Sequence, residues 1–199
     1  MLHTSRALVA GIALATAASC AATRLTSSWK DPTAGKLSFK KVLVLVLSKD
    51  ESIRRAAEDE VVRQVKRATA LPSYNLFLAD DLKEAERAKA KVQEEGFDGA
   101  VVMRLVDKSQ QLTYVPGSYP APYYSFYGYW GYGWGAAWDP GYVRTDTIVL
   151  IETNIYSVKD GKLLWSGLSE TFNPAGPVEL VQGIVARVVS DLKKQGMLQ

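Results

Sequence analysis

The strongest hydrophobic pattern in the chain is the run of residues 41–47, in which six apolar residues follow one lysine without interruption. A strand with one solvated face alternates apolar and polar residues, whereas this run has no polar position to turn toward water. Polar and charged residues flank it on both sides, which limits it to the length of a strand. We therefore predict a strand buried on both faces and expect the rest of the domain to cover it.

Apolar residues then recur at every third or fourth position, and they predict an amphipathic helix over residues 51–68. Ser48 and Glu51 have the spacing of a capping box, which predicts the start of this helix. The side expected to face the core carries Ile53, Ala57, Val61, Val65 and Ala68. The side expected to be solvated carries Arg54, Arg55, Glu58, Asp59, Arg63, Lys66 and Arg67.

The next segments repeat the alternation of strand and helix. Residues 74–79 predict a second strand, and a helix follows that begins at Asp80 or Asp81 and runs through Glu95. Residues 100–106 are apolar and predict a third strand. Short connections in this order imply right-handed crossovers and parallel pairing, so a β-α-β-α-β core of an α/β domain is expected.

A β-hairpin is predicted in the last third of the chain. Residues 147–157 and 163–172 have strand-like patterns, and Asp160 and Gly161 lie between them as a strong hairpin signal. If these two residues form the loop, Tyr156 faces Trp165 across the ladder.

The final segment predicts a helix that begins near Pro177, where the missing N–H of proline costs nothing. Its core stripe consists of Val181, Ile184, Val185, Val188 and Leu192. The predicted fold class is therefore α/β, a mixed sheet in two or three layers with the β-α-β-α-β core, a C-terminal β-hairpin and a C-terminal helix. One domain spanning residues 29–199 accommodates all of these elements.

Residues 116–142 interrupt this regularity with eleven aromatic residues among six glycines and four prolines. No helix or strand period persists there, so a long loop between the third strand and the hairpin is expected. One interpretation is a mobile low-complexity excursion whose rings pack partly on the sheet. The other is a contact surface, because tyrosine and tryptophan offer large amphipathic area. The residues predicted to bind are then Tyr123, Tyr124, Tyr127, Tyr129, Trp130, Tyr132, Trp134 and Trp138.

Residues 1–19 have the pattern of a secretory signal peptide, with Arg6 ahead of an apolar segment that ends in small residues. The apolar segment is shorter than the roughly 20 residues that a membrane span needs, so we expect it to be removed. The following residues, from Ala17 to Cys20, resemble the lipobox of bacterial lipoproteins. That resemblance implies cleavage before Cys20 and lipidation of its thiol; an ordinary signal peptide with an unmodified cysteine is the alternative.

The resemblance to lipoproteins also bears on location. Cys20 is the only cysteine, so no intramolecular disulfide forms. Ala21 stands where an aspartate would, by resemblance to Gram-negative lipoproteins, favour retention in the inner membrane. We therefore expect a lipid anchor in the outer membrane with the domain facing the periplasm. Residues 20–28 then comprise the lipidated cysteine and a tether, although residues 21–28 also suit an edge strand.

Charge and residue types exclude several classes of function. Loss of Arg6 leaves 23 basic against 21 acidic residues, which gives no reason to expect a nucleic-acid partner. Loss of His3, the only histidine, together with lipidation of Cys20, excludes Ser-His-Asp and Cys-His catalysis and His- or Cys-ligated metal sites. We predict no cofactor, no metal and no catalytic residue. A carboxylate-based cell-wall enzyme would need Glu152 and Glu170, which the predicted hairpin register places on opposite faces.

Five stretches of sequence together resemble a family of small bacterial envelope lipoproteins of unknown function. They are residues 27–32 (SSWKDP), 39–44 (FKKVLV), 114–117 (YVPG), 152–156 (ETNIY) and 161–167 (GKLLWSG). The order of elements is also similar to the α/β domain of the curli-secretion and penicillin-binding-protein-activator lipoproteins. The resemblance implies an envelope lipoprotein and brings neither an established activity nor site residues. The lipobox-like cysteine, the missing catalytic residue types and the aromatic segment lead us to expect that the protein is not an enzyme.

Two hypotheses about function follow. In the first, the aromatic segment of residues 116–142 binds an envelope partner, either a protein or peptidoglycan. In the second, the protein is a subunit of a secretion or assembly complex and forms homo-oligomers through this segment or the hairpin edge.

Overall fold

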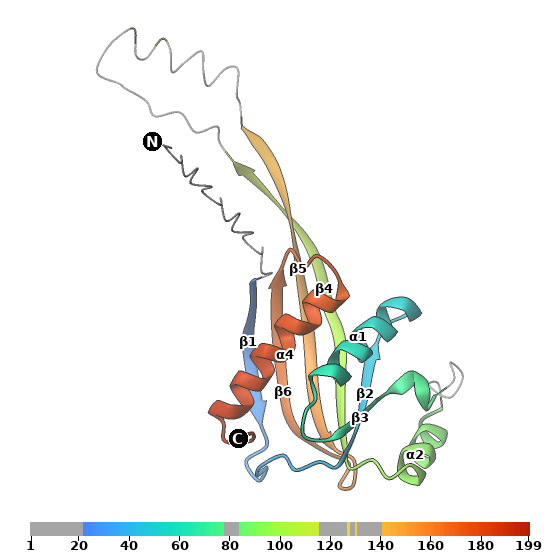
Figure 1. Ribbon diagram of the computed structural model, residues 1–199. Helices are drawn as coiled ribbons and strands as arrows, with labels where there is room; N and C mark the ends of the chain where they lie inside the picture. The colour runs from blue at the N-terminus through green and yellow to red at the C-terminus, as the bar shows by residue number, and fades with distance from the viewer. Residues whose placement is uncertain (1–21, 78–83, 116–126, 128–129, 131–140) are drawn as a thin grey trace, which may run out of the picture.

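The computed structural model describes residues 22–77, 84–115, 127, 130 and 141–199. They form a six-stranded mixed sheet in the order β1-β6-β5-β4-β2-β3, with three α-helices packed on it (Figure 1). The predicted α/β class is confirmed. The elements are β1 (Ala22–Lys30), β2 (Lys41–Leu47), α1 (Glu51–Gln64), β3 (Thr69–Pro72), η1 (Ser73–Asn75), α2 (Ala85–Glu94), β4 (Gly99–Val115), β5 (Tyr142–Ser157), β6 (Lys162–Phe172) and α4 (Pro177–Lys194).

Strand β2 lies where the apolar run predicted it. It pairs in parallel with β3 on one side and with β4 on the other, and Val42, Leu43 and Val44 are all buried. Side chains from both sides of β2 enter hydrophobic clusters, which explains why no polar residue follows Lys41 in this strand. The predicted β-α-β-α-β core with parallel pairing is confirmed.

The helices divide between the two faces of the sheet. Helices α1 and α4 cover one face, over a core that includes Trp165, Ile184 and Met197, all fully buried. A smaller cluster of Leu43 and two phenylalanines forms on the other face with residues of α2. The molecule thus has three layers beside β2 and β3 and two layers elsewhere.

Strand β1 is an edge strand that pairs antiparallel with β6 from Ala22 onward. Of the two interpretations of residues 21–28, the edge strand is the one observed for residues 22–28. Only Ala21 separates the sheet from Cys20, which lies outside the described residues.

The start of α1 differs from the predicted capping box. Asp50 is the N-cap, and its Oδ1 accepts hydrogen bonds from the backbone N–H groups of Ser52 and Ile53 at 2.9 and 3.1 Å. The Ser48 hydroxyl instead accepts a hydrogen bond from the N–H of Asp50 at 3.2 Å. Asp50, two residues after Ser48, therefore accepts the hydrogen bonds of the free backbone N–H groups at the helix start. The prediction that Ser48 and Glu51 form a capping box there is wrong.

The solvated face predicted for α1 is also partly wrong. The helix ends at Gln64, four residues before the predicted end at Ala68. Arg54 and Glu58 are buried, whereas Ile53, predicted to face the core, is 43% exposed. The reason is that α1 contacts β2 and β3 as well as α4. The buried part of its circumference is therefore wider than its apolar stripe and includes charged residues.

The predicted strand at residues 74–79 is wrong, because pairing with β2 occurs earlier, over Thr69–Pro72. The chain then turns into η1, since the backbone N–H and hydroxyl of Ser73 donate hydrogen bonds to Glu58 rather than to the sheet. The predicted helix start at Asp80 or Asp81 lies outside the described residues. Helix α2 is described from Ala85 to Glu94.

The hairpin of β5 and β6 forms with a register that differs from the prediction by two residues beside the loop and by one residue from Ile155 and Trp165 onward. Trp165 pairs with Ile155, and Tyr156 pairs with Leu163, because an irregularity separates these two pairs. The connection contains four residues rather than two, since Ser157 pairs with Lys162. The shift moves Trp165 to the helix-covered face, where it is 0% exposed.

Candidate functional site

Strands β4 and β5 continue beyond the sheet as a two-stranded ribbon (Figure 1). Strand β6 pairs with β5 only as far as Ile148, and β2 pairs with β4 only as far as Arg104. Beyond that level six pairs, from Gln110↔Thr147 to Val115↔Tyr142, are held by β4 and β5 alone. At about 3.4 Å per residue the ribbon projects on the order of 20 Å.

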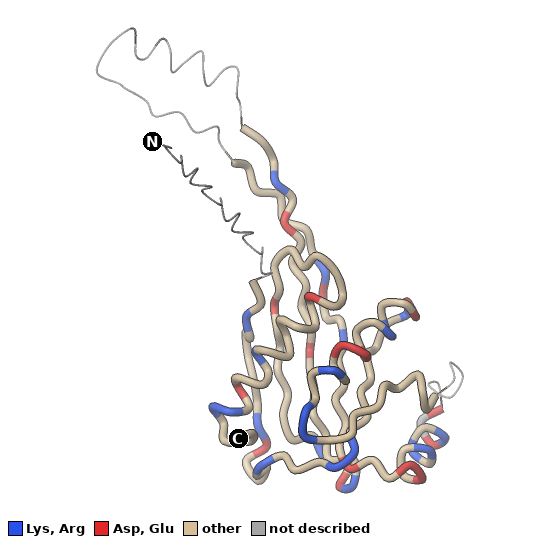
Figure 2. The backbone as a smooth tube through the Cα atoms, viewed as in Figure 1, with Lys and Arg blue, Asp and Glu red and all other residues tan. Residues whose placement is uncertain are grey.

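The ribbon is amphipathic. Leu112, Tyr114 and Val143 lie on one side by strand alternation, and they are 71%, 60% and 60% exposed. The other side carries Gln111 and a cluster of polar side chains around Asp146, and its far end carries Tyr142, which is 62% exposed. Figure 2 shows that charged residues gather on α2 and at the end of the sheet opposite the ribbon. An isolated two-stranded ribbon is marginally stable in water, so exposed apolar residues on one side suit a contact surface.

Asp146 ties the base of the ribbon to the end of β6. Its carboxylate accepts hydrogen bonds from the Asn173 side-chain amide at 2.7 Å, from the Arg144 guanidinium and from the Thr113 hydroxyl. Asn173 also pairs with the backbone of Thr147 in both directions, and it holds a φ of 47°, which asparagine tolerates better than most residues. The ribbon therefore leaves the sheet from a fixed base.

These contacts lower the pKa of Asp146 below its usual 3.8, the Asn173 hydrogen bond first and the Arg144 guanidinium second. We expect Asn173→Ala to raise the pKa of Asp146 in a carbon-13 NMR titration, with Asn154→Ala as a control. Because the folded pKa is depressed, the stabilisation of the ribbon base is complete above the unfolded pKa. It is lost as the pH falls through the lower folded value. An unchanged Asp146 pKa in Asn173→Ala would contradict this assignment.

The described residues include two of the aromatic side chains predicted to bind. Tyr127 and Trp130 are exposed, at 83% and 57%. The other six lie outside the described residues: Tyr123, Tyr124, Tyr129, Tyr132, Trp134 and Trp138. Their role in binding stays a prediction, as does lipidation of Cys20.

The two carboxylates considered for catalysis lie on the same face of the sheet. The prediction of opposite faces is wrong, because in the observed register Glu152 pairs with Leu168 and Glu170 pairs with Leu150. Each carboxylate forms an ion pair at 2.8 Å, Glu152 with Arg104 and Glu170 with Arg24. Each carboxylate therefore has its own arginine partner.

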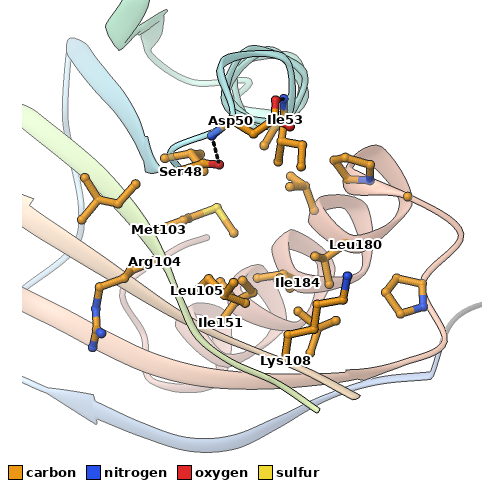
Figure 3. Close-up of a pocket in the computed structure, with 18 of the residues that line it drawn as sticks. Ser48, Asp50, Ile53, Met103, Arg104, Leu105, Lys108, Ile151, Leu180 and Ile184 are labelled. Carbon is orange, nitrogen blue, oxygen red and sulfur yellow. Dashed lines mark hydrogen bonds between the residues drawn. The ribbon is translucent and has the colours of Figure 1, made fainter. Parts of the chain in front are cut away.

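An apolar cleft that the sequence did not indicate opens between α1 and α4, beside the base of the ribbon. Its volume is about 870 Å³. Figure 3 shows side chains from both helices and from β4 and β5 around this space, while Arg104 points away from it. The residues that line it come from four separate segments, so no single stretch of sequence carries its signature.

Two further properties of the described residues bear on function. No group of three or more His, Cys, Asp or Glu side chains in this part of the chain is arranged to hold a metal ion. Among the helices described, none combines the length and hydropathy that a membrane span requires.

Comparison with known proteins finds similarity among solved structures. No protein-family model and no curated protein matches the chain. A PelC variant dodecamer from Paraburkholderia phytofirmans covers 86% of this chain and 97% of its own, with 14% identity and a TM-score of 0.43. A second PelC dodecamer from that organism, at 13% identity, covers 86% of this chain and 96% of its own, with a TM-score of 0.42.

A third solved structure, lipoprotein GNA1162 from Neisseria meningitidis, covers 78% of this chain and 99% of its own. It has 16% identity and a TM-score of 0.40. The chain is thus similar to a bacterial lipoprotein and to PelC, at levels that transfer neither an activity nor an assembly state.

Proposed function

We propose that this protein is a non-enzymatic, lipid-anchored lipoprotein of the bacterial cell envelope. It faces the periplasm from the outer membrane, and its β4–β5 ribbon and aromatic segment (residues 116–142) contact a partner at the surface of that membrane. The observation that carries the proposal is that β1 begins at the end of the sheet from which the ribbon projects.

The register of the sheet sets this geometry. Ala22 pairs with Phe172, which in turn pairs with Ile148 at the base of the ribbon. Cys20 precedes Ala22 by two residues, a span of at most about 7 Å. A lipid on Cys20 therefore holds this end of the sheet close to the membrane. The ribbon, about 20 Å long, points toward the same surface.

The side chains of the ribbon suit that surface. Its apolar side carries Leu112, Tyr114 and Val143, all mostly exposed. Tyrosine and tryptophan favour interfaces in which one end of the ring is apolar and the other is wet, and residues 116–142 are rich in both. A partner at the membrane surface would cover apolar area that the monomer leaves in water.

The proposal is tested by photo-crosslinking in intact cells that express the full chain. A probe at Tyr114 lies on the apolar side of the ribbon, and the matched probe at Gln111 lies on the polar side three residues away. A third probe at Arg63, on the charged face of α1, controls for general proximity. We expect adducts with membrane lipid or one membrane protein from Tyr114 only. Equal adducts from Gln111, adducts with peptidoglycan alone, or none would contradict the proposal.

A second candidate function is a subunit of an envelope assembly that oligomerises. It is favoured by β1, which pairs on one side with β6 and forms the edge of the described sheet. An unpaired edge is a template for a strand from another copy. Adducts between two copies from a probe at Thr26 on β1, at native abundance, would favour this candidate, whereas a monomer in membrane extracts would count against it.

A further inference from the structure

We propose that the cleft between α1 and α4 binds the acyl chain of an anionic lipid taken up from the membrane. The cleft is distinct from the ribbon, and its lining, its rim and its position each indicate the chemistry of the ligand. Only the argument from position rests on the anchor of the proposed function.

The lining of the cleft is apolar and incompletely covered. Its floor consists of Met103 and Leu105 from β4 with Val149 and Ile151 from β5 (Figure 3). Leu105 is 49% exposed although it faces the helix-covered side of the sheet beside Ile151. A volume of about 870 Å³ is within the range of roughly 300–1,000 Å³ typical of small-molecule pockets. An elongated apolar ligand would cover this surface.

The walls come from the first two turns of α1 and the first two to three turns of α4. Ile53 of α1 lies on one side, and Leu180 and Ile184 of α4 lie on the other. Ile53 is the residue of the α1 stripe that was predicted to face the core and is instead exposed. Ile53 belongs to the apolar side of α1, which is expected to be buried. An acyl chain between these helices would supply the apolar contacts that Ile53 otherwise lacks.

The rim of the cleft is cationic. Lys49 and Lys108 line it, and within the described residues neither side chain has a hydrogen-bond or ion-pair partner. Asp50 also lines the cleft, but its carboxylate caps α1 and accepts hydrogen bonds from the N–H groups of Ser52 and Ile53. Two unpaired ammonium groups beside an apolar space fit an amphiphile with an anionic head and an apolar tail.

The position of the cleft suits a ligand from the membrane. Asn173 and Pro174 line it directly after Phe172, the residue that pairs with Ala22 at the start of β1. Strand alternation also places the apolar side of the ribbon on the same face of the sheet as the cleft floor. If the lipid on Cys20 holds this end at the bilayer, the mouth of the cleft lies within reach of lipid tails.

Binding is measured in vitro with the chain from Ala21 to Gln199, which contains every described element but no lipid anchor. The probe is palmitoyl lysophosphatidylglycerol, and palmitoyl lysophosphatidylcholine, which is zwitterionic, is the matched lipid. We expect native mass spectrometry to retain one equivalent of the anionic lipid at concentrations where the zwitterionic lipid is not retained.

Two pairs of variants locate the ligand. Leu180→Trp fills the cleft and should abolish binding, whereas the same change at Leu112, on the ribbon, should leave it intact. Replacing Lys49 and Lys108 with alanine should weaken binding of the anionic lipid by about fivefold per lysine. The control replaces Lys36 and Lys159, two exposed lysines that do not line the cleft.

The outcomes separate this inference from the proposed function. Circular dichroism of Leu180→Trp establishes that it is folded, and a folded variant that still binds overturns the inference. Failure of the parent chain to bind, or equal binding of both lipids, overturns it as well. The binding assay uses neither the lipid anchor nor intact cells. Its result is therefore independent of the crosslinks that form from Tyr114 in the test of the proposed function.

Discussion

Replacing Glu58 with alanine is expected to lower the free energy of unfolding by about 3–5 kcal/mol. The side chain is 0% exposed. Its two oxygens accept hydrogen bonds from the N–H of Val46 at 3.0 Å, and from the N–H and hydroxyl of Ser73 at 2.8 and 2.7 Å. Alanine would leave these donors buried without an acceptor, and each would contribute a desolvation penalty of about 1–3 kcal/mol.

Glu58 links three elements, since it lies on α1 and its partners lie on β2 and at the start of η1. Urea denaturation of the chain from Ala21 onward measures the change. The matched control is Glu86→Ala, an exposed glutamate on α2, which should shift stability by no more than about 0.5 kcal/mol. A loss below 1 kcal/mol for Glu58→Ala would show that water satisfies the donors instead.

Glu58 also illustrates what the sequence does not contain. On the helical wheel of α1 it falls among charged residues, and the pattern predicts a solvated position. Its burial depends on Ser73, fifteen residues further along the chain, which presents donors only after β3 has paired with β2. A partnership between distant polar residues has no periodicity, so pattern analysis assigns each of them to the surface.

Elements that one stretch of sequence specifies by itself were predicted well. Strand β2 is defined by its uninterrupted apolar run, and α4 by Pro177 at its first position and a buried stripe that includes Val181, Ile184, Val188 and Leu192. These signals require no knowledge of a partner, because burial of the stripe is favourable against any apolar surface. The fold class follows from the order of such elements.

The strand register was harder to predict than the strands. The Asp160–Gly161 signal correctly indicated a hairpin, but the four-residue connection shifts the pairing by two positions and the irregularity beside Tyr156 shifts it back by one. A shift of one residue exchanges the faces of a strand, and it therefore altered the predicted positions of Trp165 and Glu170 together. Bulges depend on the packing of both faces, which local sequence does not reveal.

The candidate site could be predicted only in part. An aromatic contact surface was predicted from composition. The ribbon that leads to it was not, because it exists only through the length of the two strands: β4 continues to Val115 and β5 begins at Tyr142. The cleft was not predicted at all. Its lysines and apolar residues are ordinary in their own segments, and they form a site only because the N-terminal halves of α1 and α4 leave the sheet between them uncovered.

Replacing Trp165 with alanine is expected to lower the free energy of unfolding by about 3–5 kcal/mol, because the cavity left by a fully buried ring cannot collapse completely. The indole N–H also donates a hydrogen bond to Asp191 of α4 at 3.0 Å, so the substitution removes a link between helix and sheet. The matched control is Trp29→Ala on the neighbouring strand β1. Trp29 is about half exposed, so the same substitution should cost clearly less.

The close contact between Trp165 and Gly167 allows a sharper test. A Cβ atom added at Gly167 would lie 2.2 Å from the Trp165 ring, so Gly167→Ala forces the ring to move and should cost about 1–3 kcal/mol. The two changes should couple: once Trp165 is alanine, the added methyl group has no ring to displace, and Gly167→Ala should cost little. Additive losses in this double-mutant cycle would mean that the ring does not pack over Gly167, and that the bulge beside Tyr156 places Trp165 elsewhere in the core.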